Sequence, residues 1–213
     1  MTNLNIKSKE ELYFLWYLEE LKENNFIFNY KYEPKPFVLN EELTSTVVEE
    51  SIVKRGSDKG KVKRSSKNKV LIPSRTYTCD YLINWNISAK DIFFFDITKP
   101  ALKDNKNIFG AQWDNTLKLY FSYIEIKPSF DKFNMERLVK NNIAFVWQKE
   151  KIYVNIIKPY SLFSNSFYPK RFEYTDKNDT VKRKYKGKYV QDLNQSLKDF
   201  KNEFYKHSKN LLF

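Results

Sequence analysis

One short segment constrains this chain more than any other, the apolar run at residues 119–127, which a proline closes. Its aromatic and β-branched residues are typical of a strand. Side chains two positions apart in a strand point to the same face, so Glu125 and Lys127 should lie side by side, with Ile124 and Ile126 packing behind them. A carboxylate that can bind a divalent cation, beside an amine that can orient a water or neutralise a phosphate, is half of what metal-dependent phosphodiester hydrolysis needs.

Asp80 supplies a second carboxylate. It interrupts a strand that the sequence predicts from Arg75 to Trp85, where propensity disfavours aspartate. An unpaired buried carboxylate is costly and tends to become neutral, and a metal ion shared with Glu125 would remove that cost. Two alternatives stay open. Asp80 could cap a turn at the end of a strand, and Glu125 could form an exposed ion pair across strands.

The scarce residues exclude several classes of enzyme. The 213 residues contain one histidine, His207, and one cysteine, Cys79, which cannot build a structural zinc site or a disulfide framework. The four glycines match neither a phosphate-binding loop nor a dinucleotide-binding fingerprint. If the chain is an enzyme, its chemistry therefore rests on Asp, Glu, Lys and a recruited metal. The 17% aromatic content is enough to build a core.

The formal net charge of +12 is concentrated in two basic runs, at residues 54–69 and 182–188. Clustered cations favour phosphate backbones through counterion release and electrostatic steering. The alternative is a lysine-rich, solvated surface of the kind that AT-rich coding produces. The residues that we expect to bind nucleic acid are Lys54, Arg55, Lys61, Lys63, Arg64, Lys182, Arg183 and Lys184.

Hydrophobic periodicity predicts the order of the elements. Ser8 should cap a helix from Lys9 to about Glu23, with Glu11 as the glutamate of a capping box. Asp131 should cap a second helix that ends near residue 141. Strands are predicted at residues 26–32, 37–39, 70–72, 75–85, 92–97 and 117–127, a hairpin at 143–147 and 151–157, a mobile irregular insertion at about 44–69, a loop at 99–115, an irregular aromatic segment at 159–175, and a final helix at 190–209.

This order, with acidic residues on the first helix and second strand and Glu-x-Lys on the third, resembles the PD-(D/E)XK nuclease superfamily, including small phage endonucleases and Holliday-junction resolvases. The resemblance covers roughly residues 8–157 without the insertion. Cys79-Asp80 replaces the usual Pro-Asp, and the long gap between Asp80 and Glu125 implies a further insertion around residues 87–116.

The resemblance implies an α/β (α+β) fold with a restriction-endonuclease-like αβββαβ core. A mixed central sheet would be flanked by helices, with a C-terminal helical extension. Residues 1–157 would form the nuclease-like core with its mobile basic insertion, and residues 158–213 an aromatic and basic extension with the last helix.

The resemblance also implies roles for particular residues. Asp80, Glu125 and the backbone carbonyl of Ile126 would bind Mg²⁺ or Mn²⁺, and Lys127 would orient or help deprotonate the attacking water. Glu11 would complete the metal shell, although it could also be only the capping-box residue. Glu10 is its rival on the same helix, and Glu33 is a weaker candidate ligand.

We expect a metal-dependent endonuclease that hydrolyses DNA, with branched DNA such as a Holliday junction as one candidate substrate. The alternative is a non-catalytic nucleic-acid-binding or phage structural protein with a nuclease-like fold. The helix at residues 190–209 could form a homodimer or pack on its own domain. No apolar run is long enough to span a membrane, and the first residues lack the pattern of a signal peptide. We therefore expect a cytoplasmic protein, in the host cytoplasm if it is viral.

Overall fold

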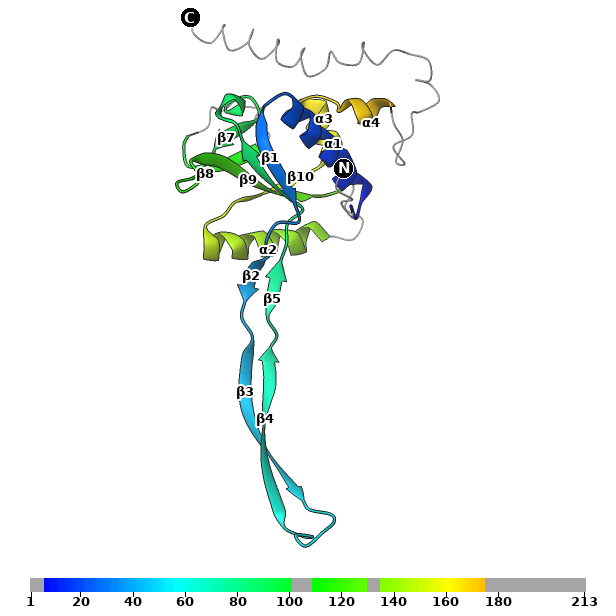
Figure 1. Ribbon diagram of the computed structural model, residues 1–213, viewed down its shortest axis with the longest axis vertical. Coiled ribbons are helices and arrows are strands. Elements are labelled where there is room, and N and C mark those ends of the chain that lie inside the picture. Colours follow the sequence, from blue (N-terminus) through cyan, green and yellow to red (C-terminus); the bar gives the residue numbers. More distant parts are fainter. Residues whose placement is uncertain (1–5, 101–108, 130–134, 175–213) are drawn as a thin grey trace, which may run out of the picture. The chain divides into compact units, whose positions relative to one another are not determined.

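The computed structural model describes residues 6–100, 109–129 and 135–174. The chain divides into two compact units, a smaller one at Pro36–Tyr77 and a larger one formed by the segments on either side of it. The elements of the larger unit are α1 (Lys9–Glu23), β1 (Ile27–Tyr32), β6 (Tyr81–Trp85), the short 3-10 helix η1 (Ile87–Ala89), β7 (Phe94–Asp96), β8 (Phe109–Asp114), β9 (Leu119–Ile126), α2 (Met135–Glu150), β10 (Val154–Ile157), α3 (Pro159–Asn165) and α4 (Lys170–Tyr174) (Figure 1). The smaller unit contains β2 (Phe37–Asn40), β3 (Leu43–Ile52), β4 (Val62–Ile72) and β5 (Arg75–Tyr77).

A mixed six-stranded sheet forms the centre of the larger unit, in the order β1-β6-β9-β8-β7, with β10 also paired to β9. β6 runs antiparallel to both of its neighbours, β1 and β9, and β10 runs parallel to β9. One edge of β9 pairs with β6. Its other edge is divided, because β8 pairs with residues 119–121 and β10 with residues 123–126. The mixed sheet and its helices confirm the predicted α/β (α+β) class.

The side chain of Asn155 joins the two strands that share this edge of β9. It accepts a hydrogen bond from the Gly110 amide at 2.8 Å and donates to the carbonyls of Gly110 at 2.9 Å and Tyr123 at 3.1 Å. Asn155 is buried, so these bonds satisfy polar groups that water cannot reach. The three strands are therefore fixed around the carboxyl end of β9, where the predicted site lies.

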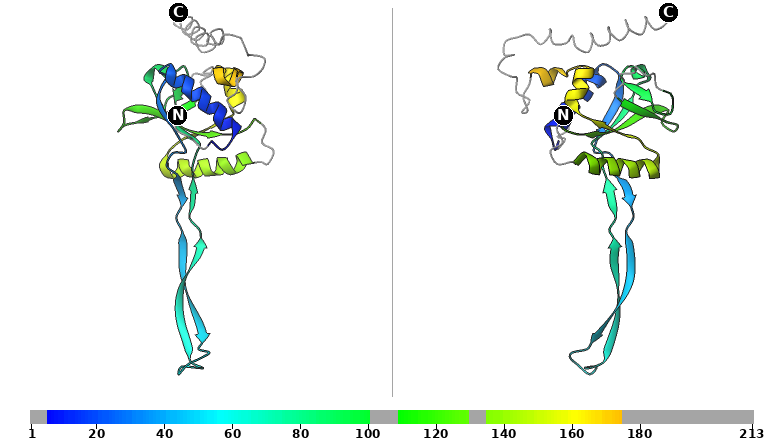
Figure 2. Two further views of the ribbon diagram at one scale, coloured as in Figure 1. Left: turned by 45° about the vertical axis from the view of Figure 1, so that its right-hand side comes forward. Right: turned by 180° about the vertical axis from the view of Figure 1, so that it is seen from behind.

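Aromatic side chains fill the core between α1 and the sheet. Phe14 packs edge-on against Tyr81, with the ring centroids 5.3 Å apart, and Tyr17 stacks on Phe167 at 4.4 Å. Figure 2 shows α3 and α4 beside α1 on one side of the sheet, with α2 on the other. Glu20 of α1 accepts a hydrogen bond from the amide of Lys170, the first residue of α4, so residues 158–174 belong to the same unit as the sheet. None of the helices in the described ranges is long and apolar enough to cross a membrane.

The structure confirms several predicted elements and corrects others. The helix at Lys9–Glu23 and its Ser8 cap form as predicted, and the strand predicted at residues 117–127 is β9. The predicted hairpin at 143–157 is wrong, because α2 continues to Glu150 and only Val154–Ile157 forms a strand. Val139 and Val146, seven residues apart, are buried, and this helical spacing outweighs the β propensity of the apolar run between them.

Two segments predicted to be irregular contain regular structure. The predicted loop at 99–115 includes β8, and the aromatic segment at 159–175 includes the short helices α3 and α4. Asp131 and the predicted helix at 190–209 lie outside the described residues.

The smaller unit is a long antiparallel hairpin rather than the irregular segment predicted at residues 44–69. β3 and β4 pair over ten positions, and β2 pairs with β5. The turn between β3 and β4 contains Gly56 and Gly60, both at a φ of 89°, where a residue with a side chain would be strained. Polar side chains along both strands concealed the alternation that marks a strand, because neither face of this hairpin packs on a core.

Candidate functional site

Asp80 lies at the start of β6, beside the end of β9. Its amide donates a hydrogen bond to the carbonyl of Ile124 at 3.0 Å, and its carboxylate atom Oδ2 accepts one from the amide of Ile126 at 2.6 Å. The two strands pair directly next to this point, with Tyr81 opposite Ile124. The sheet therefore fixes the Asp80 carboxylate against the residue between Glu125 and Lys127.

Glu125 and Lys127 lie side by side, as their spacing predicts. Lys127 Nζ is 2.7 Å from Glu125 Oε1, and the side chains are 20% and 8% exposed, respectively. Ile124 and Ile126 are buried in the core behind them. The burial of Glu125 argues against the alternative of a solvent-exposed ion pair.

The electrostatics of this site favour an added cation. The pKa of Asp80 is raised to about 7, first by burial and then by the charges of Glu125 and Glu11, whereas the Ile126 amide and Lys127 oppose this shift. An aspartate normally ionises near pH 4, so at neutral pH this carboxyl is held close to its midpoint. The carboxylates repel one another more than the nearby donors compensate, and a divalent cation would relieve that repulsion.

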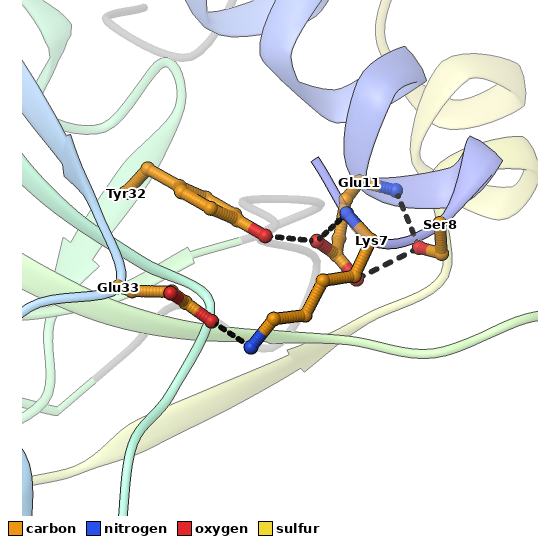
Figure 3. A network of polar contacts seen from close by, with 5 residues as sticks. All are labelled: Lys7, Ser8, Glu11, Tyr32 and Glu33. Carbon is orange, nitrogen blue, oxygen red and sulfur yellow. Dashed lines mark hydrogen bonds and ion pairs between the residues drawn. The ribbon is translucent and has the colours of Figure 1, made fainter. Parts of the chain in front are cut away.

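Glu11 and Ser8 are hydrogen-bonded to each other at the start of α1 (Figure 3). Its amide donates to Ser8 Oγ at 3.1 Å, and its carboxylate accepts hydrogen bonds from Ser8 Oγ at 2.9 Å, Tyr32 OH at 2.7 Å and the Lys7 amide at 3.3 Å. Burial, followed by the hydrogen bond to Glu11, raises the pKa of Tyr32, so the phenol remains a donor. Glu11 therefore does take part in capping α1. Glu11 still acts on the site, because its charge raises the pKa of Asp80.

Lys7 and Tyr32 were missed as members of this network by reasoning from sequence. Lys7 Nζ forms an ion pair with Glu33, the candidate ligand that follows β1, and the Glu33 amide donates to the carbonyl of Asp80 at 2.8 Å (Figure 3). No sequence pattern singles out a lysine that precedes a helix cap, and Tyr32 is one of several aromatic residues in its predicted strand. Only the pairing of β1 with β6, which sets Tyr32 opposite Tyr81, brings these groups together.

The donors fit a hard cation in an open site. Mg²⁺ is commonly bound by one or two carboxylates, keeps several waters and takes substrate phosphates as further ligands. Asp80 and Glu125 could provide those two carboxylates. Within the described ranges, no three His, Cys, Asp or Glu side chains are grouped as a metal site. Of the predicted ligands, Asp80, Glu125 and Ile126 lie at the end of β9, whereas the Glu11 carboxylate already accepts three hydrogen bonds.

The residues predicted to bind nucleic acid fall into two groups. Lys54, Arg55, Lys61, Lys63 and Arg64 belong to the hairpin unit, whereas Lys182, Arg183 and Lys184 lie outside the described residues. Two of the hairpin cations pair within their own unit, Arg64 with Glu50 and Lys61 with Asp58.

Comparison of the chain with known proteins found no matching family model, no matching curated protein and no matching solved structure.

Proposed function

We propose that this protein is a metal-dependent nuclease that hydrolyses DNA phosphodiester bonds, with Asp80, Glu125 and Lys127 at its centre. The observation that carries the proposal is that the Asp80 carboxylate is hydrogen-bonded to the residue between Glu125 and Lys127, which form an ion pair at the end of β9. Asp80 is held to the Ile126 amide at 2.6 Å, and Lys127 is paired with Glu125 at 2.7 Å.

The chain topology supports the same proposal. After α1, the strands β1, β6 and β9 form an antiparallel succession, and α2 then leads to β10, which is parallel to β9. This is the αβββαβ order that the resemblance to PD-(D/E)XK nucleases implies. β7, β8 and the hairpin unit are then insertions between core strands.

Each residue has a chemical task in this proposal. Asp80 and Glu125 would hold Mg²⁺ or Mn²⁺, which when bound lowers the pKa of a water and neutralises charge on the phosphate. Lys127 keeps an ammonium donor beside Glu125, where it can orient the attacking water or pair with a phosphate oxygen. Glu11 would fix the first helix and add negative charge near Asp80.

A cleavage panel tests the proposal. The purified protein would be incubated with linear, nicked, single-stranded and four-way-junction DNA, with Mg²⁺, with Mn²⁺ or with EDTA. We expect metal-dependent cleavage that Asp80→Asn and Lys127→Ala abolish. Glu150→Gln and Lys35→Ala, which change exposed side chains, serve as matched controls. Equal cleavage by the site variants and the parent would refute the assignment of the site, and the preferred DNA form would show whether branched substrates are selected.

A non-catalytic nucleic-acid-binding protein is the second candidate. It is favoured by the hydrogen bonds that already occupy Glu11, which leave two carboxylates for a metal. Calorimetric titration with Mg²⁺ separates the two functions. No metal binding and no cleavage, combined with DNA binding that weakens steeply with salt, would support the non-catalytic protein.

A further inference from the structure

The β3–β4 hairpin has two chemically different faces. Directly opposed residues of an antiparallel pair share a face, and successive pairs alternate between faces. Lys63 is opposite Ser51, Lys67 opposite Val47, and Lys69 opposite Ser45. These three lysines lie on one face, which we call the lysine face.

The opposite face is electrically balanced and richer in apolar residues. Arg64 stands opposite Glu50 and forms an ion pair with it at 2.8 Å. The remaining positions of this face include Val48, Ile52, Val62 and Val70, which are 60%, 65%, 58% and 48% exposed. Positive charge is therefore sorted to one side of the hairpin.

Positive charge on the lysine face is only partly compensated. Lys67 pairs with Glu49 at 2.7 Å, whereas in the hairpin as described neither Lys63 nor Lys69 lies in an ion pair. The turn between the two strands adds Lys54, Arg55 and Lys59. A row of lysines with a net positive charge attracts a polyanion, and binding gains free energy by releasing the counterions of the polyanion.

The dimensions of the hairpin suit duplex DNA. Ten paired positions at a rise of about 3.3 Å per residue make a ribbon about 30 Å long, close to the roughly 34 Å of one turn of B-DNA. The major groove of B-DNA, about 12 Å wide, admits a two-stranded ribbon. The major groove of duplex RNA is too deep and narrow to be entered in this way.

We propose that the β3–β4 hairpin is a DNA-binding arm that lies in the major groove, with its lysine face turned towards the DNA and its lysine side chains reaching the phosphates that flank the groove. The inference rests on the proposed function for the choice of DNA as partner. It adds Lys67 and Lys69 to the contact residues and assigns Arg64 to the face turned away from the phosphates.

Binding measurements on the full chain test the arm separately from the chemistry. Fluorescence anisotropy with a 30-base-pair DNA duplex would be measured at several salt concentrations in an Asp80→Asn background, which prevents cleavage. The test variant is Lys63→Gln/Lys67→Gln/Lys69→Gln. Its matched control, Lys22→Gln/Lys31→Gln/Lys35→Gln, removes the same charge from the other unit. A second control, Glu50→Gln/Arg64→Gln, alters the opposite face.

We expect the lysine-face variant to bind at least about tenfold more weakly, with the slope of log K against log salt reduced by about 2.7 for three lost phosphate contacts. Both controls should bind like the parent. Equal binding by the lysine-face variant would overturn the inference, as would equal loss in the charge-matched control. Stronger binding of duplex RNA than of duplex DNA would also overturn it, as would a lysine-dependent dimer in place of DNA binding.

The same experiments separate this inference from the proposed function. If the parent cleaves no substrate but the lysine-face variant loses DNA binding, the DNA-binding role of the hairpin is supported and the nuclease function is not. If the parent cleaves DNA and the lysine-face variant binds and cleaves as well as the parent, the arm fails and the nuclease stands.

Discussion

The amide of Ile126 donates a hydrogen bond to Asp80 Oδ2 at 2.6 Å. The two residues are 46 positions apart, and this bond brings the carboxylate at the start of β6 to the Glu125–Lys127 pair. Backbone donors are held rigidly by a sheet, so the Asp80 carboxylate is oriented before any ligand binds.

Asp80 should make the metal-free protein less stable as the pH rises. Because its pKa is raised to about 7, the folded state retains a proton between about pH 4 and pH 7 that the unfolded state has released. Stability therefore falls across this window, by roughly 4 kcal/mol at most. We expect Asp80→Asn to be more stable than the parent at pH 8 and less sensitive to pH. Urea unfolding in EDTA at pH 5 and pH 8 measures this difference, with Glu150→Gln as control. The same pH dependence in Asp80→Asn and in the parent would contradict the prediction.

Mg²⁺ should stabilise the parent at pH 8. A ligand that binds only the folded state raises the free energy of unfolding by about 2.7 kcal/mol at a concentration 100 times its dissociation constant. The effect should shrink at pH 5.5, where Asp80 is protonated, and disappear in Asp80→Asn and Glu125→Gln. Thermal unfolding with and without MgCl₂ checks this prediction. If Mg²⁺ stabilises both variants as much as the parent, the metal does not bind at Asp80 and Glu125.

Lys127→Met should destabilise the protein by roughly 3 kcal/mol, because it leaves the buried Glu125 carboxylate without its cation. Adding Glu125→Gln should restore much of that loss, since the uncompensated charge is then gone. Denaturant unfolding of the two single variants and the double variant gives the coupling free energy. Strictly additive losses would indicate that the pair contributes no interaction of its own.

Glu11→Gln should separate the capping role from the electrostatic one. Glutamine can replace glutamate in a capping box, so the free energy of unfolding should change little. Removing the charge should lower the pKa of Asp80 and shift the pH dependence of stability to lower pH. Ser8→Ala, which removes the cap itself, should cost about 1 kcal/mol. If Glu11→Gln leaves the pH profile unchanged, Glu11 is a cap and nothing more.

Gly110→Ala should be destabilised by about 1–3 kcal/mol through overpacking. A Cβ at this position would lie 2.7 Å from Ile97 Cγ2 and 2.9 Å from Tyr153 Cε1. Chemical denaturation measures the loss. Gly60→Ala offers a comparison in open space, where only its φ of 89° is unfavourable.

The sequence by itself determined the features that depend on near neighbours. The helix at Lys9–Glu23 follows from its cap and apolar residues, and the pairing of Glu125 with Lys127 follows from the two-residue repeat of one strand. The class of fold also follows from the succession of these periodic segments. Each of these depends on contacts within a few positions of the chain, which propensity and spacing report directly.

Only the tertiary structure decided which distant residues meet. The pairing of β6 with β9 brings Asp80 to Ile126, and the pairing of β1 with β6 brings Tyr32 towards Glu11. Residues 143–147, whose local preference favoured a strand, belong to α2, in which Val139 and Val146 are buried. These outcomes depend on partners far away in the sequence, and the free energy of that packing exceeds the small differences in propensity that a single sequence displays.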